Sequence, residues 1–285
     1  MKILVTGANG QLGQELVQQL TKHDVELFAY TKSELDICNL NAVINVVEEI
    51  QPHVIINVAA YTKVDLAETN KELAFQVNAY GQRNLTVAAE KVGAKICYVS
   101  TDYVFDGDAS EPYEEHALVN PIGVYGKSKY AGEQLTQSLS TKFFIVRTAW
   151  VYGEYGPNFV KTMLRLAKER DELGVVSDQI GSPTYTVDLA EFIIELVQTE
   201  KYGVYHCTNG GSCSWYEFAK AIFEESGIEI KMNPLTTDQY PTPAKRPTYS
   251  VLSDAALKLN DFQPTRHWRD GLKAFLNNAK NNNLL

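Results

Sequence analysis

The chain has 285 residues, 45% hydrophobic and 21% charged, enough for one large α/β unit or a domain with a smaller lobe. Its 35 acidic and 26 basic residues give a net charge of −9 without a basic cluster, so we expect no nucleic-acid partner. No apolar run approaches the roughly 18 residues of a membrane span. The run after Met1-Lys2 is too short for a secretory signal, so we expect a cytoplasmic protein with no membrane partner.

The cysteines and histidines indicate neither a disulfide framework nor a metal site. The four cysteines lie far apart without a C-x-x-C pair, and the five histidines show no ligand spacing. We therefore expect reduced thiols and no metal held by these residues.

Short apolar segments alternate with helix-period segments through the first half of the chain. Strands rich in Val and Ile, without strict polar alternation, are expected at Lys2–Thr6, Glu26–Thr31, Val54–Val58, Lys95–Ser100 and Phe143–Thr148. Helical stripes are expected at Leu12–Leu20, Val43–Ile50 and Leu73–Val92. This order predicts an α/β domain over residues 1–150, with a doubly wound, Rossmann-like parallel sheet.

The pattern changes after about residue 150, where helices dominate. The expected elements are helices at Asn158–Arg170, Val187–Thr199, Ser214–Gly227 and Trp268–Ala279, and an isolated strand at Gly203–Thr208. A proline-rich segment, Tyr240–Pro247, predicts an irregular loop. We interpret residues 151–285 as a smaller C-terminal lobe that mainly binds substrate.

A glycine-rich turn follows the first strand. Gly7, Gly10 and Gly13 recur every third residue, a spacing typical of a dinucleotide-binding turn. Gly7 permits the tight turn, Gly10 lets the backbone approach a pyrophosphate, and Gly13 lets the helix pack on the sheet. The alternative is an ordinary strand-turn-helix connection.

The end of the second strand bears on the choice of nicotinamide. An acid there would bind a ribose 2′-hydroxyl, but after Tyr30 the chain has no acid until Glu34. The side chains of Thr31 and Lys32 can instead bind a 2′-phosphate. This favours NADPH and leaves NADH open, with Tyr30 beside the cofactor.

Tyr125 and Lys129 lie four residues apart, which places them on one face of the helix expected at Pro121–Leu139. A free tyrosine has a pKa near about 10, and a neighbouring ammonium can stabilise the phenolate. We therefore interpret Tyr125 as a proton donor and Lys129 as the residue that tunes it. Chance also yields this spacing, and Tyr216 and Lys220 repeat it in the second lobe.

Thr101 follows the strand that precedes this helix, at the carboxyl end where α/β sheets bind ligands. Its hydroxyl can hold a substrate carbonyl in line with Tyr125. The alternative is a turn residue at a strand end.

Together these segments resemble the extended short-chain dehydrogenase/reductase superfamily, in which Thr6-Gly-x-x-Gly-x-x-Gly13, Asn57-Val-Ala-Ala60 and Tyr125-x-x-x-Lys129 occur in this order. Within it the chain resembles the dTDP-4-dehydrorhamnose reductase family nearly end to end. That narrower resemblance is carried by the segments Ala60–Asp65, Ser100–Phe105, Arg147–Tyr152 and Pro241–Pro247.

The resemblance implies roles for residues that the spacing arguments do not reach. Cofactor contacts are implied at Gly10, Gln11 and Leu12 for the pyrophosphate, at Asp36 and Ile37 for the adenine, and at Ala60, Tyr61 and Thr62 along the cofactor. Substrate contacts are implied at Thr101, Asp102 and Trp150 for the sugar, and at Arg246 for the nucleotide diphosphate.

The implied reaction reduces the 4-keto group of dTDP-6-deoxy-L-lyxo-4-hexulose to dTDP-L-rhamnose. Some family members use Mg²⁺ at a dimer contact through a glutamate like Glu15, which leaves Mg²⁺ and the choice between monomer and homodimer open. One alternative is a nucleotide-sugar epimerase or 4,6-dehydratase, although a dehydratase would carry Asp-Glu where this chain has Asp102-Tyr103. Another is a non-catalytic, NADP-binding regulatory subunit of a methionine adenosyltransferase.

Overall fold

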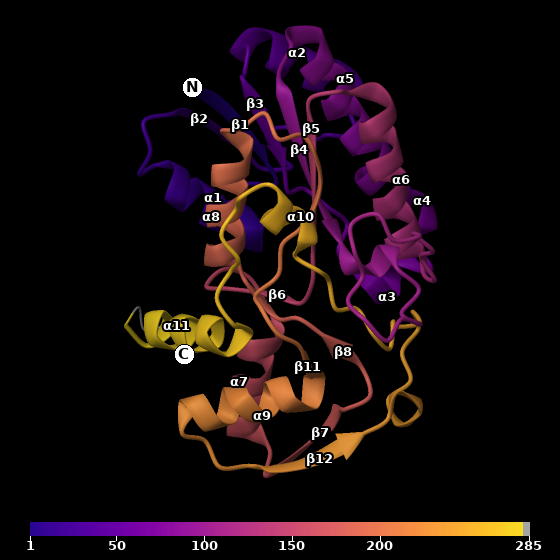
Figure 1. The fold of residues 1–285 in the computed structure, drawn as a ribbon, viewed down its shortest axis with the longest axis vertical. Helices are drawn as coiled ribbons and strands as arrows, with labels where there is room; N and C mark the ends of the chain where they lie inside the picture. The colour runs from indigo at the N-terminus through magenta and orange to yellow at the C-terminus, as the bar shows by residue number, and fades with distance from the viewer. Residues whose placement is uncertain (282–285) are drawn as a thin grey trace.

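A six-stranded parallel sheet forms the upper part of the computed structural model, which describes residues 1–281 (Figure 1). In spatial order its strands are β10 (Gly203–His206), β5 (Phe143–Thr148), β4 (Lys95–Thr101), β3 (Val54–Asn57), β1 (Lys2–Thr6) and β2 (Glu26–Tyr30). The chain runs outward from β1 to β2 and then returns past β1 to β3. The strand order therefore reverses between β1 and β3, and the expected doubly wound α/β fold is confirmed.

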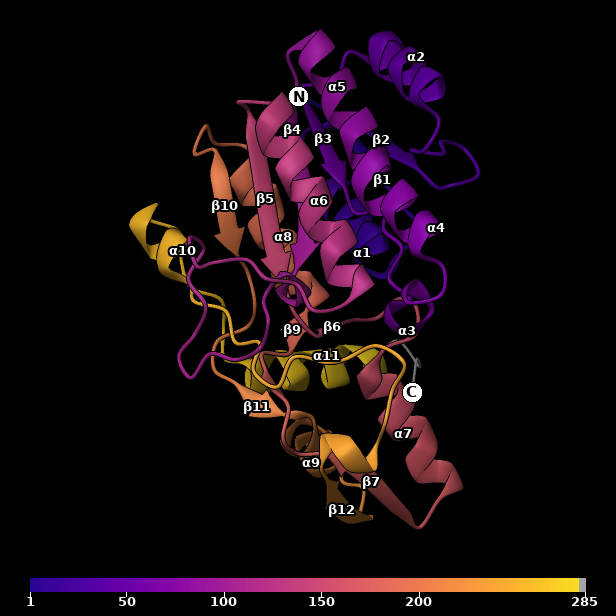
Figure 2. The ribbon, with the colours of Figure 1, turned by 90° about the vertical axis from the view of Figure 1, so that its right-hand side faces the viewer.

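Helices cover both faces of this sheet, which explains why its strands are apolar throughout. Ile3 and Val5 point into a core shared with α1 (Gln11–Leu20) and α8 (Thr186–Val197). Leu4 points the other way, into a core shared with α2 (Leu40–Ile50) and α5 (Gln82–Val92). Figure 2 shows α5 and α6 (Val124–Leu139) in front of the sheet.

Two helices of the first domain differ from the expectation in ways that matter for the site. The helix expected over Leu73–Val92 is confirmed, but it comprises α4 (Lys71–Phe75), a π-helical segment (Gln76–Gly81) and α5. The helix expected from Pro121 begins only at Val124, so that boundary was wrong. Val124 N donates to Glu68 Oε1 at 2.8 Å, and this carboxylate, at the end of α3 (Val64–Ala67), satisfies the first helical N–H instead of Asn120.

The second lobe lies below the sheet and has its own apolar core (Figure 1). Its elements are α7 (Phe159–Glu169), β7 (Glu172–Val176), β8 (Ile180–Gly181), β11 (Cys213–Ser214), α9 (Trp215–Ser226), β12 (Lys231–Leu235) and α11 (Trp268–Asn281). The short parallel pair β6 (Val151–Tyr152) and β9 (Thr184–Tyr185) lies where the chain crosses between the lobes. The proline-rich segment is irregular, as expected, and α10 (Ala255–Leu259) contacts β10.

The domain boundary at residue 150 does not hold for Thr186–His206. β10 pairs with β5 as the sixth strand of the sheet, and α8 packs on α1, because its apolar face completes the core behind β1. The chain thus enters the second lobe, returns to the first, leaves again, and returns once more at α10 before it reaches α11. All four cysteines are free thiols. Within residues 1–281, no helix has the length and apolar composition needed to cross a bilayer.

Candidate active site

The glycine turn lies at the point where the strand order reverses. Gly7 has a φ of +76°, and a Cβ there would lie 2.6 Å from Ala59 N, which follows the neighbouring strand β3. A Cβ on Gly13 would lie 2.2 Å from the Gly7 carbonyl oxygen. Both positions therefore require glycine for close packing, and they lie at the carboxyl edge of the sheet where the strand order reverses, which is where α/β sheets bind ligands.

The first turn of α1 has backbone N–H groups to offer a ligand. Its N-cap is Gly10, which provides no side-chain cap. Such a helix end favours anions. Leu12 is buried in the core, so only its main chain can face a pyrophosphate. The Gln11 side chain turns away toward the second lobe.

The end of β2 places an acid where the sequence suggested none. The Tyr30 carbonyl accepts from Ala8 N at 3.0 Å, which joins this strand end to the glycine turn. Glu34 folds back and accepts from Thr31 N at 2.8 Å and from Thr31 Oγ1 at 2.7 Å. The donors of Thr31 are thus engaged by a carboxylate, while Lys32 is exposed.

The expected adenine contacts differ in accessibility. Asp36 is exposed beside a hollow of about 570 Å³, and its Oδ1 accepts from Cys38 N at 3.0 Å. Ile37 is buried and its side chain packs against Gly81.

Asn78, which the sequence analysis missed, fixes the segment expected to run along the cofactor. Its Oδ1 accepts from Tyr61 N at 2.8 Å, and its Nδ2 donates to the Tyr61 carbonyl at 3.1 Å and to Ser128 Oγ at 2.9 Å. Asn78 is fully buried in the π-helical segment, so it joins Ala60–Thr62 to helix α6. In the sequence, the one sign of this role was an asparagine within an otherwise helical stretch.

Thr101 and Tyr125 meet at the carboxyl end of β4. Tyr125 is partly exposed and its ring packs edge-on against Tyr103, with centroids 5.6 Å apart. Burial raises the pKa of Tyr125 to about 12, and a side-chain hydrogen bond with Thr101 opposes the rise. Thr101 Oγ1 also donates to Asp102 Oδ1 at 3.0 Å, and burial raises the pKa of Asp102 to about 6. The phenol therefore keeps its proton at neutral pH.

Lys129 lies one turn further along α6, but its environment differs from the expected one. Its Nζ donates to the Val99 carbonyl at 2.6 Å and lies 4.0 Å from the centroid of the Tyr98 ring. Burial lowers the pKa of Lys129 to about 7, and the charge of Glu133 opposes the fall. Burial is the largest influence on the pKa of both groups, and it acts in opposite directions on them, so the interpretation that this ammonium tunes Tyr125 stays a prediction.

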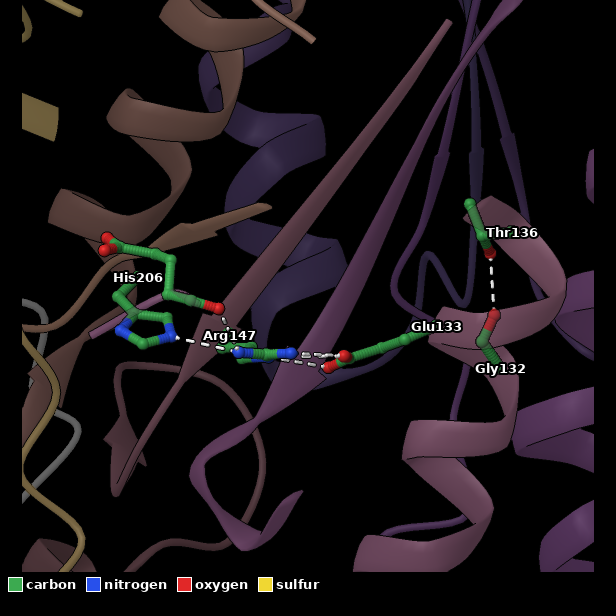
Figure 3. A network of polar contacts seen from close by, with 6 residues as sticks. Gly132, Glu133, Thr136, Arg147 and His206 are labelled. Carbon is green, nitrogen blue, oxygen red and sulfur yellow. Dashed lines mark hydrogen bonds and ion pairs between the residues drawn. The ribbon is translucent and has the colours of Figure 1, made fainter. Parts of the chain in front are cut away.

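A buried ion pair connects helix α6 to strand β5 (Figure 3). Arg147 on β5 holds Glu133 through Nε and Nη2, at 3.0 and 2.7 Å, and both side chains are at most 4% exposed. Arg147 Nη1 donates to the Glu115 carbonyl and lies 3.4 Å from His206 Nε2. Burial and the guanidinium together lower the pKa of His206 to about 3, so the imidazole stays neutral. This network fixes α6 against β5.

Trp150 lies between the sheet and the second lobe in a constrained conformation. Its φ is +49°, uncommon for a residue with a side chain. Its indole stacks on Trp215, with centroids 3.5 Å apart and planes 6° from parallel. A Cβ on Gly181 would lie 2.5 Å from the Trp150 ring, so that glycine makes room for it.

Arg246, in the proline-rich segment, reaches back to the first domain. Its Nη2 pairs with Asp65 Oδ2 at 2.9 Å, while Ala244 N donates to Asp65 Oδ1 at 3.2 Å. The proline-rich segment is thereby fastened beside α3, near the Ala60–Thr62 segment, with its guanidinium partly exposed.

Glu15, the possible Mg²⁺ ligand, is buried on α1 and accepts from Gln19 Nε2 at 2.8 Å. Across residues 1–281, no three His, Cys, Asp or Glu side chains gather as a metal site would require.

The doubly wound sheet, the glycine turn and the Tyr-x-x-x-Lys helix define an oxidoreductase of the extended short-chain dehydrogenase/reductase class. Residues 1–281 match the family model of the RmlD substrate binding domain. A dTDP-4-dehydrorhamnose reductase from Aggregatibacter actinomycetemcomitans is 48% identical, over 88% of this chain and 90% of the relative. The chain belongs to the dTDP-4-dehydrorhamnose reductase family.

Two solved structures with that description are equally similar. A dTDP-4-dehydrorhamnose reductase from Clostridium acetobutylicum is 50% identical, with a TM-score of 0.97 and coverage of 98% of this chain and 100% of that one. One from Bacillus anthracis, in complex with NADP, is also 50% identical, with a TM-score of 0.95 and coverage of 96% and 98%. The resemblance read from the sequence is thereby confirmed.

Proposed function

We propose that the chain reduces the 4-keto group of dTDP-6-deoxy-L-lyxo-4-hexulose to dTDP-L-rhamnose. The observation that carries this proposal is the place of Tyr125, whose ring packs against Tyr103 just after the end of β4, at the same carboxyl edge of the sheet as the glycine turn. Membership of the dTDP-4-dehydrorhamnose reductase family supports the choice of substrate. The NADP complex of the Bacillus anthracis relative supports NADPH as the cofactor.

Each residue has a distinct part in the proposed reaction. The bound nicotinamide supplies a hydride to the 4-keto carbon. Tyr125 gives its proton to the developing alkoxide, and a pKa raised to about 12 keeps that proton in place until the oxygen becomes more basic. Thr101, whose hydroxyl donates to Asp102 Oδ1 without substrate, turns that donor to the same oxygen and holds it in line. Lys129 orients the cofactor ribose and balances the charge left on the phenolate.

The sugar nucleotide would lie between the two lobes. Trp150 covers the sugar, Asp102 contacts it from the turn after β4, and Arg246 reaches the diphosphate from the proline-rich segment. The glycine turn and the main chain of Gln11 bind the pyrophosphate of the cofactor. The cytoplasmic location and the choice between monomer and homodimer stay predictions.

The test compares Tyr125→Phe with Tyr216→Phe, its counterpart in the second Tyr-x-x-x-Lys pair. Loss of a general acid typically lowers the rate about 10²–10⁴-fold, so we expect that fall in kcat for Tyr125→Phe alone, with NADPH affinity nearly unchanged. The assay follows the absorbance of the reduced nicotinamide with the dTDP-keto sugar, using NADPH or NADH, with and without a chelator. Equal turnover in the two variants would remove Tyr125 from the mechanism.

The same assay separates the alternatives. A dehydratase or epimerase recycles its nicotinamide, whereas the proposed reductase consumes one equivalent for each sugar reduced. A regulatory subunit would bind NADP and a partner enzyme without any turnover of the sugar.

A further inference from the structure

Gln11, the first residue of α1, connects the dinucleotide-binding turn to the second lobe through its side chain. Its Nε2 donates to the Val151 carbonyl at 3.1 Å, and its Oε1 accepts from Asn158 Nδ2 at 2.9 Å. Both ends of the amide are therefore engaged, which fixes the orientation of the Gln11 side chain.

Asn158 anchors the far end of this bridge to a helix terminus. Its Oδ1 accepts from Lys161 N at 3.1 Å as the N-cap of α7, and its Nδ2 also donates to the Gly153 carbonyl at 2.8 Å. The bridge thus connects the N-terminus of α1 to the N-terminus of α7. Because each terminus belongs to a rigid helix, the bridge fixes the position of α7 relative to α1.

Val151 connects the bridge to Trp150, the residue proposed to cover the sugar. It directly follows Trp150, whose positive φ and stacking on Trp215 leave the indole little freedom. A hydrogen bond that holds the Val151 carbonyl therefore also limits where the Trp150 backbone can lie.

We infer that the Gln11 side chain is a positioning residue, which holds Trp150 and the second lobe in register with the cofactor-binding turn. This inference rests on the proposed function, because it assigns Trp150 to the sugar. Without the bridge, a smaller fraction of molecules holds the indole in the position that binds the sugar. The apparent affinity for the sugar falls in proportion to that fraction. Cofactor binding is affected less, because the Gln11 main chain remains.

The test compares Gln11→Glu with Gln14→Glu. Gln14 Nε2 donates to the Asn9 carbonyl at 3.0 Å, within the same turn, so Gln14→Glu removes an amide donor and adds a charge without touching the second lobe. Loss of one amide hydrogen bond should raise KM for the dTDP-keto sugar about tenfold in Gln11→Glu relative to Gln14→Glu. The NADPH dissociation constants of the two variants should agree. The near-ultraviolet circular dichroism of the stacked indoles should change in Gln11→Glu alone.

Asn158→Asp provides a second variant, since it keeps the cap of α7 and loses the Nδ2 donor to Gln11 and to the Gly153 carbonyl. It should also raise KM for the sugar with little change in NADPH affinity. Equal KM values in Gln11→Glu and Gln14→Glu, or an unchanged KM in Asn158→Asp, would overturn the inference. Wild-type protein that fails to oxidise NADPH with this sugar would instead refute the proposed function.

Discussion

Replacing Glu133 with glutamine should destabilise the protein severely, because it leaves the Arg147 guanidinium buried without its counter-charge. The pair is bidentate, and the two side chains are 4% and 0% exposed. Breaking a buried pair on one side costs about 3–5 kcal/mol. For a chain of this size that lowers the thermal midpoint by roughly 10 °C.

Glu48→Gln is the matched control, since Glu48 pairs with Lys91 at 3.2 Å with both side chains about half exposed. An exposed pair contributes at most about 1 kcal/mol, so its loss should lower the midpoint by no more than about 3 °C. Thermal unfolding followed by far-ultraviolet circular dichroism at pH 7 measures both. Equal shifts of the thermal midpoint in the two variants would refute the view that burial makes the loss of the Glu133–Arg147 pair more costly to stability.

A double replacement separates the charge from the packing. Replacing Glu133 with leucine and Arg147 with methionine removes both charges together and keeps apolar volume in place. Exchange of a whole buried pair for apolar side chains is often neutral or stabilising. The double variant should therefore recover most of the midpoint lost in Glu133→Gln.

Three further predictions address the site itself. Asp65→Asn should release Arg246 for the diphosphate and lower KM for the sugar nucleotide about two- to fivefold, because the partly exposed pair is worth at most about 1 kcal/mol. A rise in KM would show instead that the pair holds the proline-rich segment in place. Gly181→Ala should displace the Trp150 indole, which changes the near-ultraviolet circular dichroism and raises KM for the sugar. Burial lowers the pKa of Lys129 to about 7 from its ordinary 10.5, so between these values the folded amine has released a proton that the unfolded one still binds. Stability due to Lys129 should therefore rise with pH, and the wild-type midpoint should gain on that of Lys129→Met between about pH 7 and pH 9.

The sequence was sufficient for the first five strands of the sheet and for the glycine turn, because local chemistry determines both. Strands covered on two faces need apolar residues throughout, so β1 and β3–β5 could be placed nearly to the residue. Gly7 and Gly13 are required because a Cβ at these positions would lie 2.6 and 2.2 Å from backbone atoms. A dinucleotide-binding turn of this spacing brings those backbone atoms close.

Features that depend on distant partners could not be predicted in this way. The start of α6 is set by Glu68, which lies far back in the chain and carries no capping pattern for that helix. The strand β10 looked isolated because its partner β5 comes about sixty residues earlier. Asn78 acquires its role from a π-helical segment that turns its amide toward Tyr61 and Ser128, and helical periodicity does not reveal such a segment.

The Tyr125–Lys129 pair shows the same limit within the chemistry. A four-residue spacing fixes a shared helix face, but it does not fix the charge on either group. The Val99 carbonyl accepts from the amine at 2.6 Å in a buried position, and burial lowers the pKa of Lys129 to about 7. For a reduction this suits the first step, since a phenol whose pKa is about 12 arrives carrying the proton it must give. In the proposed reaction the ammonium acts after that transfer, because the negative charge of the new phenolate raises the pKa of Lys129.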